Sequence, residues 1–290
     1  MKSHLKRISF PLIALFGLAL IFYPVLSNVL YDLRQDGVID DYQTAVQSIP
    51  ENDPALLRAL SLARAYNERL ASGTVNLNDP YANEDQVQYG DTISAMMDVT
   101  GTGIIGVVEI PRLALTLPVF YGTEDNELEQ GAGTLEYTSI PIGGESTHSV
   151  LCAHSGLSSA KLFSDLPNME IGDLFFLHVM GLDLAYQVDQ IETVLPEDVS
   201  RITITTGEDY CTLLTCVPYG INTHRLLVRG TRTDYLPEQT AEITENTPAP
   251  RQSVWLREYI LSILLGLAVF AVILLVWSVW NRFRRKKGTQ

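Results

Sequence analysis

Two long runs without charge lie near the ends of the chain. Residues 8–30 and residues 259–280 contain no charged side chain, and a helix needs about 20 apolar residues to cross a bilayer. Basic residues lie beside both runs, in residues 1–7 and in residues 281–290. Because basic flanks stay in the cytoplasm, the pattern predicts two transmembrane helices, cytoplasmic termini and an extracellular segment between the helices.

The first run has a second interpretation, because a cleaved signal peptide is also basic and then apolar. Residues 8–30 are longer than a usual signal core and show no clear small-residue cleavage site. We therefore favour a retained helix there. The second run ends in the basic stretch 282–287, which is typical of a membrane helix.

After the first run, residues 31–92 are predicted to contain helices and then a loop. Asp53 is suited to be an N-cap, with Pro54 at the first helical position. Apolar residues then recur at helical spacing, at Leu56, Leu60, Ala63 and Leu70. Residues 73–91 are polar and loop-like.

From residue 93 onward the pattern changes to short apolar runs separated by Gly, Pro and Asn. The clear runs are residues 104–110, 113–120, 149–154, 173–180, 184–195, 210–217 and 225–231. Their spacing predicts seven or eight strands in a β-barrel or sandwich, within a domain at 93–236. Residues 237–258 begin rich in Pro, Thr and Glu and are predicted to be an extracellular linker.

Composition narrows the class of protein further. Of 290 residues 46% are hydrophobic, which excludes a wholly disordered chain. The formal net charge of −14 argues against a nucleic-acid partner, because a duplex repels an acidic chain. Three cysteines are too few for a disulfide-stapled scaffold.

A cysteine stands where one predicted strand meets a turn. Cys216 comes at the end of the run 210–217 and is followed by Pro218 and Gly220. A strand end holds a side chain firmly and leaves it accessible, as a nucleophile requires. Free cysteine is also often a small buried hydrophobic residue, so both interpretations stay open at this point.

Two other residues could activate the Cys216 thiol, whose ordinary pKa of about 8.5 leaves it mostly protonated at neutral pH. Arg225 opens the next predicted strand, and an antiparallel hairpin would return it beside Cys216. There it could stabilise a thiolate or an oxyanion, although a surface arginine would fit the same pattern. His154, before a Ser-Gly turn, could act as general acid and base.

The remaining histidines of the outer segment are not expected to take part in catalysis. His148 is predicted to lie in a polar turn at 145–149. His178 lies in the middle of a strand and is expected to be a satisfied strand residue. His224 alternates to the face opposite Arg225 and is expected to face solvent.

These residues carry a resemblance to a known family. The stretch TLLTCVPYGINTHRLLVRGTR, residues 212–232, resembles the signature of the sortases, which is TLxTC followed by an arginine on the next strand. Leu-Pro-Val at 117–119, Thr-His-Ser-Val at 147–150 and Ala-Lys-Leu-Phe at 160–163 are similar to the class C, pilin-polymerising sortases. The resemblance covers about residues 93–233.

The resemblance implies a role for each of three residues. Cys216 matches the nucleophile, His154 the catalytic histidine and Arg225 the catalytic arginine. The family fold it implies is mainly β: a closed eight-stranded sortase-type barrel with N-terminal helices and a lid loop. With the two predicted membrane helices, this accounts for nearly the whole chain.

The class C sortases also carry a lid with an Asp-Pro-aromatic motif, which Asp79-Pro80-Tyr81 matches. The resemblance implies that the Asp79 carboxylate pairs with Arg225 and that the Tyr81 ring covers the Cys216 sulfur. Tyr81 stands where tryptophan or phenylalanine is commoner, and its hydroxyl needs a hydrogen-bond partner.

The implied reaction is transpeptidation on the extracellular face of the cell membrane. Cys216 would attack the Thr–Gly carbonyl of an LPxTG-like sorting signal on a pilin subunit, and a pilin lysine amine would resolve the thioacyl intermediate. The implied partners are pilin subunits, their acceptor lysine and the lipid bilayer. Two alternatives stay open: a housekeeping sortase that attaches surface proteins to peptidoglycan, and a non-enzymatic surface β-barrel protein.

No cofactor and no metal are expected. Cys211, five residues before Cys216, should face the opposite way and pack, whereas Cys152 shares a face with His154. A zinc site built from these four residues is disfavoured, because the alternation of the strand points the two thiols of Cys211 and Cys216 apart.

Overall fold

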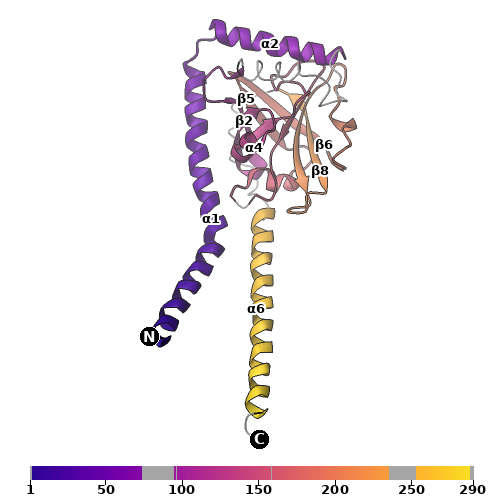
Figure 1. Cartoon of the computed structure of the whole chain (residues 1–290). Coiled ribbons are helices and arrows are strands. Elements are labelled where there is room, and N and C mark those ends of the chain that lie inside the picture. Colours follow the sequence, from indigo (N-terminus) through magenta and orange to yellow (C-terminus); the bar gives the residue numbers. More distant parts are fainter. Residues whose placement is uncertain (1, 74–94, 96, 158, 235–252, 288–290) are drawn as a thin grey trace, which may run out of the picture. The chain divides into compact units, whose positions relative to one another are not determined.

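The chain divides into two compact units by its internal contacts, and each is described by itself. The computed structural model describes residues 2–73, 95, 97–157, 159–234 and 253–287 (Figure 1). One unit comprises residues 24–251, and the other comprises residues 1–23 and 252–290. The predicted loop, the lid motif and most of the predicted linker lie outside the described residues.

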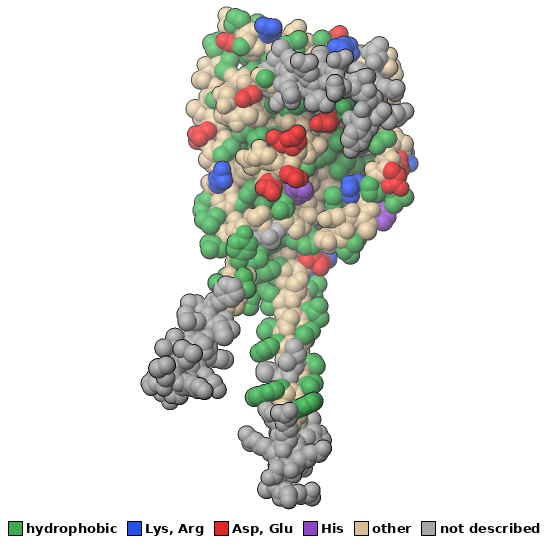
Figure 2. Space-filling model, in the orientation of Figure 1, with side chains coloured by type: hydrophobic (Ala, Val, Ile, Leu, Met, Phe, Trp, Pro, Cys, Tyr) green, Lys and Arg blue, Asp and Glu red, His purple; other side chains and the backbone are tan. Residues whose placement is uncertain are grey.

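The smaller unit contains the helix predicted as the second membrane span. Helix α6 runs from Val254 to Lys287, and its described side chains between Leu256 and Trp280 include many exposed apolar ones (Figure 2). In the described part of the chain, it is the one helix long and apolar enough to cross a membrane, over Val254–Trp277. The first predicted span, residues 8–30, lies in α1 (Lys2–Ser48) and stays a prediction.

The larger unit begins with the end of α1 and with α2 (Pro54–Ala71). The Asp53 carboxylate accepts from the backbone N–H groups of Ala55 and Leu56, at 2.8 and 3.1 Å, so the predicted N-cap is confirmed. Helix α2 buries an apolar face on the barrel. Asn67 joins the two, because its amide both donates to and accepts from the backbone of Ile140.

Eight strands form a closed barrel, in the order β1-β2-β3-β4-β7-β8-β6-β5. The strands are β1 (Ile104–Ile110), β2 (Leu115–Tyr121), β3 (Ala132–Thr134), β4 (Thr147–Cys152), β5 (Leu174–Val179), β6 (Leu182–Val194), β7 (Asp209–Val217) and β8 (His224–Thr233). Short helices in the connections are η1 (Pro111–Leu113), α4 (Asp125–Gln130), η2 (Leu162–Asn168) and η3 (Ser200–Ile202). The predicted barrel is confirmed, and the strand that the apolar runs missed is β3.

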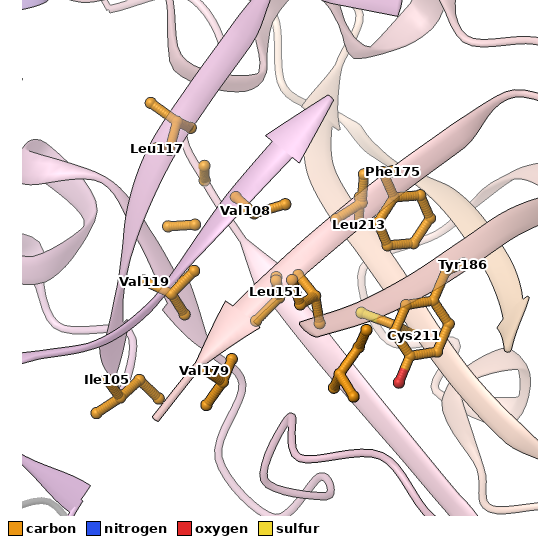
Figure 3. Packing of buried hydrophobic residues seen from close by; sticks show 14 of the residues in the cluster. Ile105, Val108, Leu117, Val119, Leu151, Phe175, Val179, Tyr186, Cys211 and Leu213 are labelled. Carbon is orange, nitrogen blue, oxygen red and sulfur yellow. The ribbon is translucent and has the colours of Figure 1, made fainter. Parts of the chain in front are cut away.

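Alternate side chains of the strands fill the barrel (Figure 3). Leu151 of β4 and Leu213 of β7 are fully buried there, and the Phe175 and Tyr186 rings stack with centroids 5.5 Å apart. A Cβ at Gly230 of β8 would lie 2.6 Å from the Phe175 ring. Glycine is therefore required there for the close approach of β8 to this aromatic pair.

Candidate active site

Cys216 and Arg225 lie directly opposite each other on one hairpin. Strands β7 and β8 pair antiparallel, and the register sets the Cα of Cys216 against the Cα of Arg225. Side chains directly opposite in such a pair project from the same face of the sheet. The predicted return of Arg225 to the end of the cysteine strand is therefore confirmed.

His154 approaches the same point from a different part of the chain. Strand β4 runs parallel to β7, with Cys152 opposite Leu214. The contact continues beyond the strand: Ala153 N–H donates to Leu214 O at 3.2 Å, and Thr215 Oγ1 donates to Ala153 O at 2.8 Å. Extending this register by two residues sets His154 next to Cys216, on a neighbouring chain segment about 4.8 Å away.

The two cysteines of β7 face opposite ways, as predicted. Cys211 is fully buried in the barrel, beside Tyr186 in Figure 3, whereas Cys216 is half-buried on the outer face. Burial raises the pKa of the Cys211 thiol well above its ordinary value, and the nearby Asp209 carboxylate adds to the rise. Cys211 therefore stays protonated and inert, so that within β7 only Cys216 is exposed enough to react.

The third cysteine lies close to the site without being able to act in it. Cys152 is buried at the end of β4, on the face of the sheet that carries Cys216. Burial, with a smaller contribution from Cys216 and against the effect of Arg225, raises the pKa of Cys152 to about 12. At neutral pH it is a neutral thiol beside the reactive one.

The Arg225 guanidinium is held at the rim of the barrel by the loop between β7 and β8. Its Nη1 donates to the carbonyl oxygens of Asn222 and His224, at 3.1 and 3.2 Å. Because a guanidinium carries five N–H donors, these two bonds leave donors that can face an anion. The arrangement fits a fixed positive group that stabilises charge developing near Cys216.

The loop that follows His154 packs on the loop between β7 and β8. His154 O accepts from Phe163 N–H at 3.1 Å, and Gly156 N–H donates to Ser164 Oγ at 3.0 Å. Gly156 has φ +84°, and a Cβ there would lie 3.2 Å from Gly220 N. Glycine is needed for both reasons, and it lets the two loops close against each other beside the candidate site.

The prediction for His148 is wrong. His148 lies within β4, 1% exposed, and not in a polar turn. The run of polar residues 145–149 hides the start of the strand, because Thr147 and Ser149 are buried polar residues that break the apolar alternation. The one available signal was the Thr-His-Ser-Val motif in the family resemblance.

His178 is a strand residue with hydrogen-bond partners, as predicted, whereas His224 departs in part from its predicted exposure to solvent. His178 in β5 contacts Asp183 and Glu109, with Nδ1–Oδ1 at 2.6 Å and Nε2–Oε2 at 3.6 Å. Burial lowers the pKa of His178, but its contacts with the two carboxylates outweigh burial and raise the pKa from its ordinary 6.5 to about 9. His224 is half-buried rather than free in solvent, and its Nδ1 lies 2.9 Å from Thr223 Oγ1.

The lid residues Asp79, Pro80 and Tyr81 lie outside the described residues, so their predicted contacts with Arg225 and Cys216 stay predictions. The described part of the chain contains no group of three or more His, Cys, Asp or Glu side chains placed to hold a metal ion.

Comparisons with known proteins agree with this geometry. The model of the sortase domain matches residues 108–233. Sortase C of Streptococcus pneumoniae, described with respect to catalysis and pilin substrate specificity, is 44% identical with a TM-score of 0.59, over 69% of this chain and 97% of that one. Sortase C of Clostridium perfringens, solved with a C-terminal cell wall sorting motif, is 40% identical with a TM-score of 0.57, over 69% of this chain and 99% of that one.

A more distant relative marks the limits of the likeness. Sortase A of Streptococcus agalactiae is 34% identical over 127 residues, which are 43% of this chain, and this chain spans about half of that protein, 51%. The agreement with the sortase C structures, in contrast, extends over nearly their full length. The chain therefore belongs to the class C sortases, which are cysteine transpeptidases.

Proposed function

We propose that this chain is a membrane-anchored pilin polymerase, which joins pilin subunits through their sorting signals. The substrate would be a pilin with an LPxTG-like sorting signal near its C-terminus, and the acceptor would be a lysine amine of another pilin. The catalytic domain would act on the extracellular face of the membrane. The pilin substrate specificity named for the pneumococcal sortase C and the C-terminal cell wall sorting motif solved with the clostridial one support the substrate part of this proposal.

The observation that supports this proposal most is the convergence at the barrel rim. Cys216 and Arg225 are register partners, and the chain beyond β4 brings His154 to the end of β7. A half-buried thiol, a fixed guanidinium and an imidazole are what acyl transfer through a thioester needs. The two other thiols are buried and have raised pKa values, so they would not compete.

In the first half-reaction, the Cys216 thiolate would attack the carbonyl carbon of the threonine in the Thr–Gly bond. Arg225 would stabilise the oxyanion of the tetrahedral intermediate with its N–H donors. His154 would give a proton to the departing glycine amine, which leaves the pilin bound to Cys216 as a thioester.

In the second half-reaction, a lysine amine would attack the thioester carbonyl. His154 would take the proton that the amine releases, and the Cys216 thiolate would leave as the isopeptide bond forms. Water would give hydrolysis instead, so a covered site favours transfer over hydrolysis. We assign that cover to the lid motif Asp79-Pro80-Tyr81, on the family resemblance.

The test uses the full chain in detergent and a pilin that carries an LPxTG-like tail. We expect wild-type protein to form a ladder of covalent pilin polymers on denaturing gels, and Cys216→Ala to form none. Cys211→Ala is the matched control, because it removes a thiol of the same strand on the opposite face. Equal ladders from wild type and Cys216→Ala would refute the mechanism.

The acceptor is tested separately. Reductive methylation of all pilin lysines should abolish the ladder while cleavage of the sorting signal, trapped with hydroxylamine, continues. The housekeeping function makes a different prediction. Unmodified pilin would then form no ladder, and the sorting signal of methylated pilin would still be cleaved at the same rate when a peptidoglycan stem peptide is present. If neither protein is cleaved, the non-enzymatic alternative is favoured.

A further inference from the structure

Helix η2 holds the backbone at and just after His154. His154 O accepts from Phe163 N–H at 3.1 Å, and Gly156 N–H donates to Ser164 Oγ at 3.0 Å. Phe163 is fully buried and Ser164 is 1% exposed, so both bonds start from a part of η2 that is packed into the protein. The backbone position of the candidate catalytic histidine therefore depends on how the chain enters η2.

The entry into η2 has an unusual backbone conformation. Leu162, its first residue, has φ +43°, in the left-handed region that a residue with a side chain rarely adopts. Such a residue keeps this conformation only where its surroundings hold it there. The Leu162 side chain is 1% exposed and packs in the core, which provides one constraint on this turn.

Lys161 provides a second constraint on the turn. Its Nζ lies 3.3 Å from Asp165 Oδ2, so the ion pair joins the residue before η2 to the interior of η2, across Leu162. The Asp165 side chain is 8% exposed, and a carboxylate buried to that degree needs a positive partner. Lys161 belongs to the Ala-Lys-Leu-Phe stretch at 160–163, to which the proposed mechanism gives no role.

The chain just before η2, residues 159–161, also contacts helix α1, in the compact unit that contains the barrel. Ser27 Oγ of α1 donates to Ser159 O at 3.2 Å. Burial raises the pKa of Asp32 on α1, the positive charge of Lys161 opposes that rise, and Asp36 adds to it. The Lys161 ammonium is therefore close enough to act on a carboxylate of α1 as well as on one of η2.

We propose that Lys161 is a positioning residue: it fixes the entry into η2 against α1, so that η2 holds His154 beside Cys216. The inference rests on the proposed function, because it concerns the proton transfer that is assigned there to His154. Lys161 acts through His154 and not on the substrate. Its loss should therefore lower kcat and leave KM close to that of the wild type.

The test uses the full chain in detergent, an LPxTG-type peptide and hydroxylamine as the nucleophile. Lys161→Met removes the charge and keeps most of the side-chain length, whereas Lys161→Arg keeps the charge. We expect Lys161→Met to lower kcat by about tenfold with KM unchanged, because a small misplacement of a proton donor is costly. Lys161→Arg should restore most of the kcat.

Three results of this assay would contradict the inference. The first is folded Lys161→Met with the kcat of the wild type. The second is a change that falls on KM and not on kcat. The third is an equal loss of kcat in Lys161→Met and Lys161→Arg, because the charge at this position would then not matter.

Arg229→Met is the matched control for the loss of an ion pair. Arg229 pairs with Asp189 at 2.7 Å, and this pair joins β8 to β6 in the barrel wall. The control should lower stability and leave the kcat per folded molecule close to that of the wild type. If it lowers kcat as much as Lys161→Met does, the effect is one of general stability and the inference is wrong.

A second variant covers the case in which Lys161→Met fails to fold. Ser27→Ala combined with Asp32→Asn removes both contacts on the α1 side and leaves η2 unchanged. A lower kcat with unchanged KM supports the inference, and an unchanged kcat contradicts it. Failure of wild-type protein to cleave the peptide overturns the proposed function and this inference with it, whereas cleavage by the wild type with unchanged kcat in the variants overturns the inference alone.

Discussion

The two faces of strand β7 differ in what they contribute. The inner face carries Cys211, Leu213 and Thr215, all at most 1% exposed. The outer face carries Thr212, which binds His148, and Cys216, which faces Arg225. The same nine-residue strand therefore holds the barrel together with one set of residues and presents the candidate nucleophile with the other.

This difference explains why one cysteine of the strand is suited to chemistry and the other is not. Inside the barrel, burial raises the pKa of Cys211 and no solvent reaches it. On the outside, Cys216 is half-buried and has an arginine as its register partner. Because side chains alternate along a strand, the fold can fix the backbone of the nucleophile through one face without covering the other.

The largest effect should come from the outer face. Arg225→Ala should lower kcat by about 10²–10³, the range found when an oxyanion donor is removed. Arg229→Ala is the control, because Arg229 also projects from β8 but pairs with Asp189. Steady-state cleavage of an LPxTG-type peptide measures both. A loss with Arg229→Ala as large as with Arg225→Ala would show that general surface charge, and not position beside Cys216, is what matters.

An inner-face substitution should change stability and spare the chemistry. Leu213→Ala opens a cavity in the fully buried core and should lower the free energy of unfolding by about 2–5 kcal/mol. The kcat per folded molecule should stay close to that of the wild type. Urea unfolding and active-site titration give the two values, and a loss of kcat in the folded fraction would break the separation between the faces.

A histidine outside the candidate site should make stability depend on pH. The folded pKa of His178, about 9, lies above its ordinary 6.5, so its stabilisation is complete below pH 6.5 and is lost as the pH rises through 9. Because Asp183 is half-exposed, we expect a loss of about 1–2 kcal/mol. The measurement is the difference in unfolding free energy between wild type and His178→Gln from pH 6 to pH 10; a constant difference contradicts the prediction.

The smallest effect concerns the one inner-face residue that reaches toward the site. Thr215 Oγ1 donates to Ala153 O, next to His154. Thr215→Val leaves that buried carbonyl without this donor and should cost about 1 kcal/mol of stability. A fall in kcat beyond the loss of folded protein would show that the inner face also positions His154. Thr212→Val, on the outer face, is the matched control.

Local patterns predicted most of the barrel and the hairpin of the site. Strand β1 coincides with the apolar run 104–110, and the turn after Cys216 predicted the return of Arg225. Strand β3 was missed because three residues, Ala132–Thr134, are too few to show an alternation. His148 was misassigned because a buried polar residue that is fully hydrogen-bonded has the same sequence pattern as a turn.

The position of His154 beside Cys216 could not be predicted from local pattern at all. It depends on parallel pairing of β4 with β7, whose residues are far apart in the sequence. Parallel neighbours are joined by long connections, so neither turn chemistry nor spacing reports which strands meet. Its residue type and place before a turn made His154 a candidate general acid and base, but only the family resemblance matched it to the catalytic histidine. The lid motif rests on that resemblance alone.

The β7–β8 hairpin has a consequence for how the enzyme matures. Thiol and guanidinium meet as soon as this short local element forms, whereas the imidazole arrives only when a distant strand docks, and such long-range contacts form slowly. A chain that has not finished folding would thus hold an incomplete site. Under the proposed function, competence to handle substrate would be gained together with the finished barrel, so partly folded protein would not form dead-end thioesters.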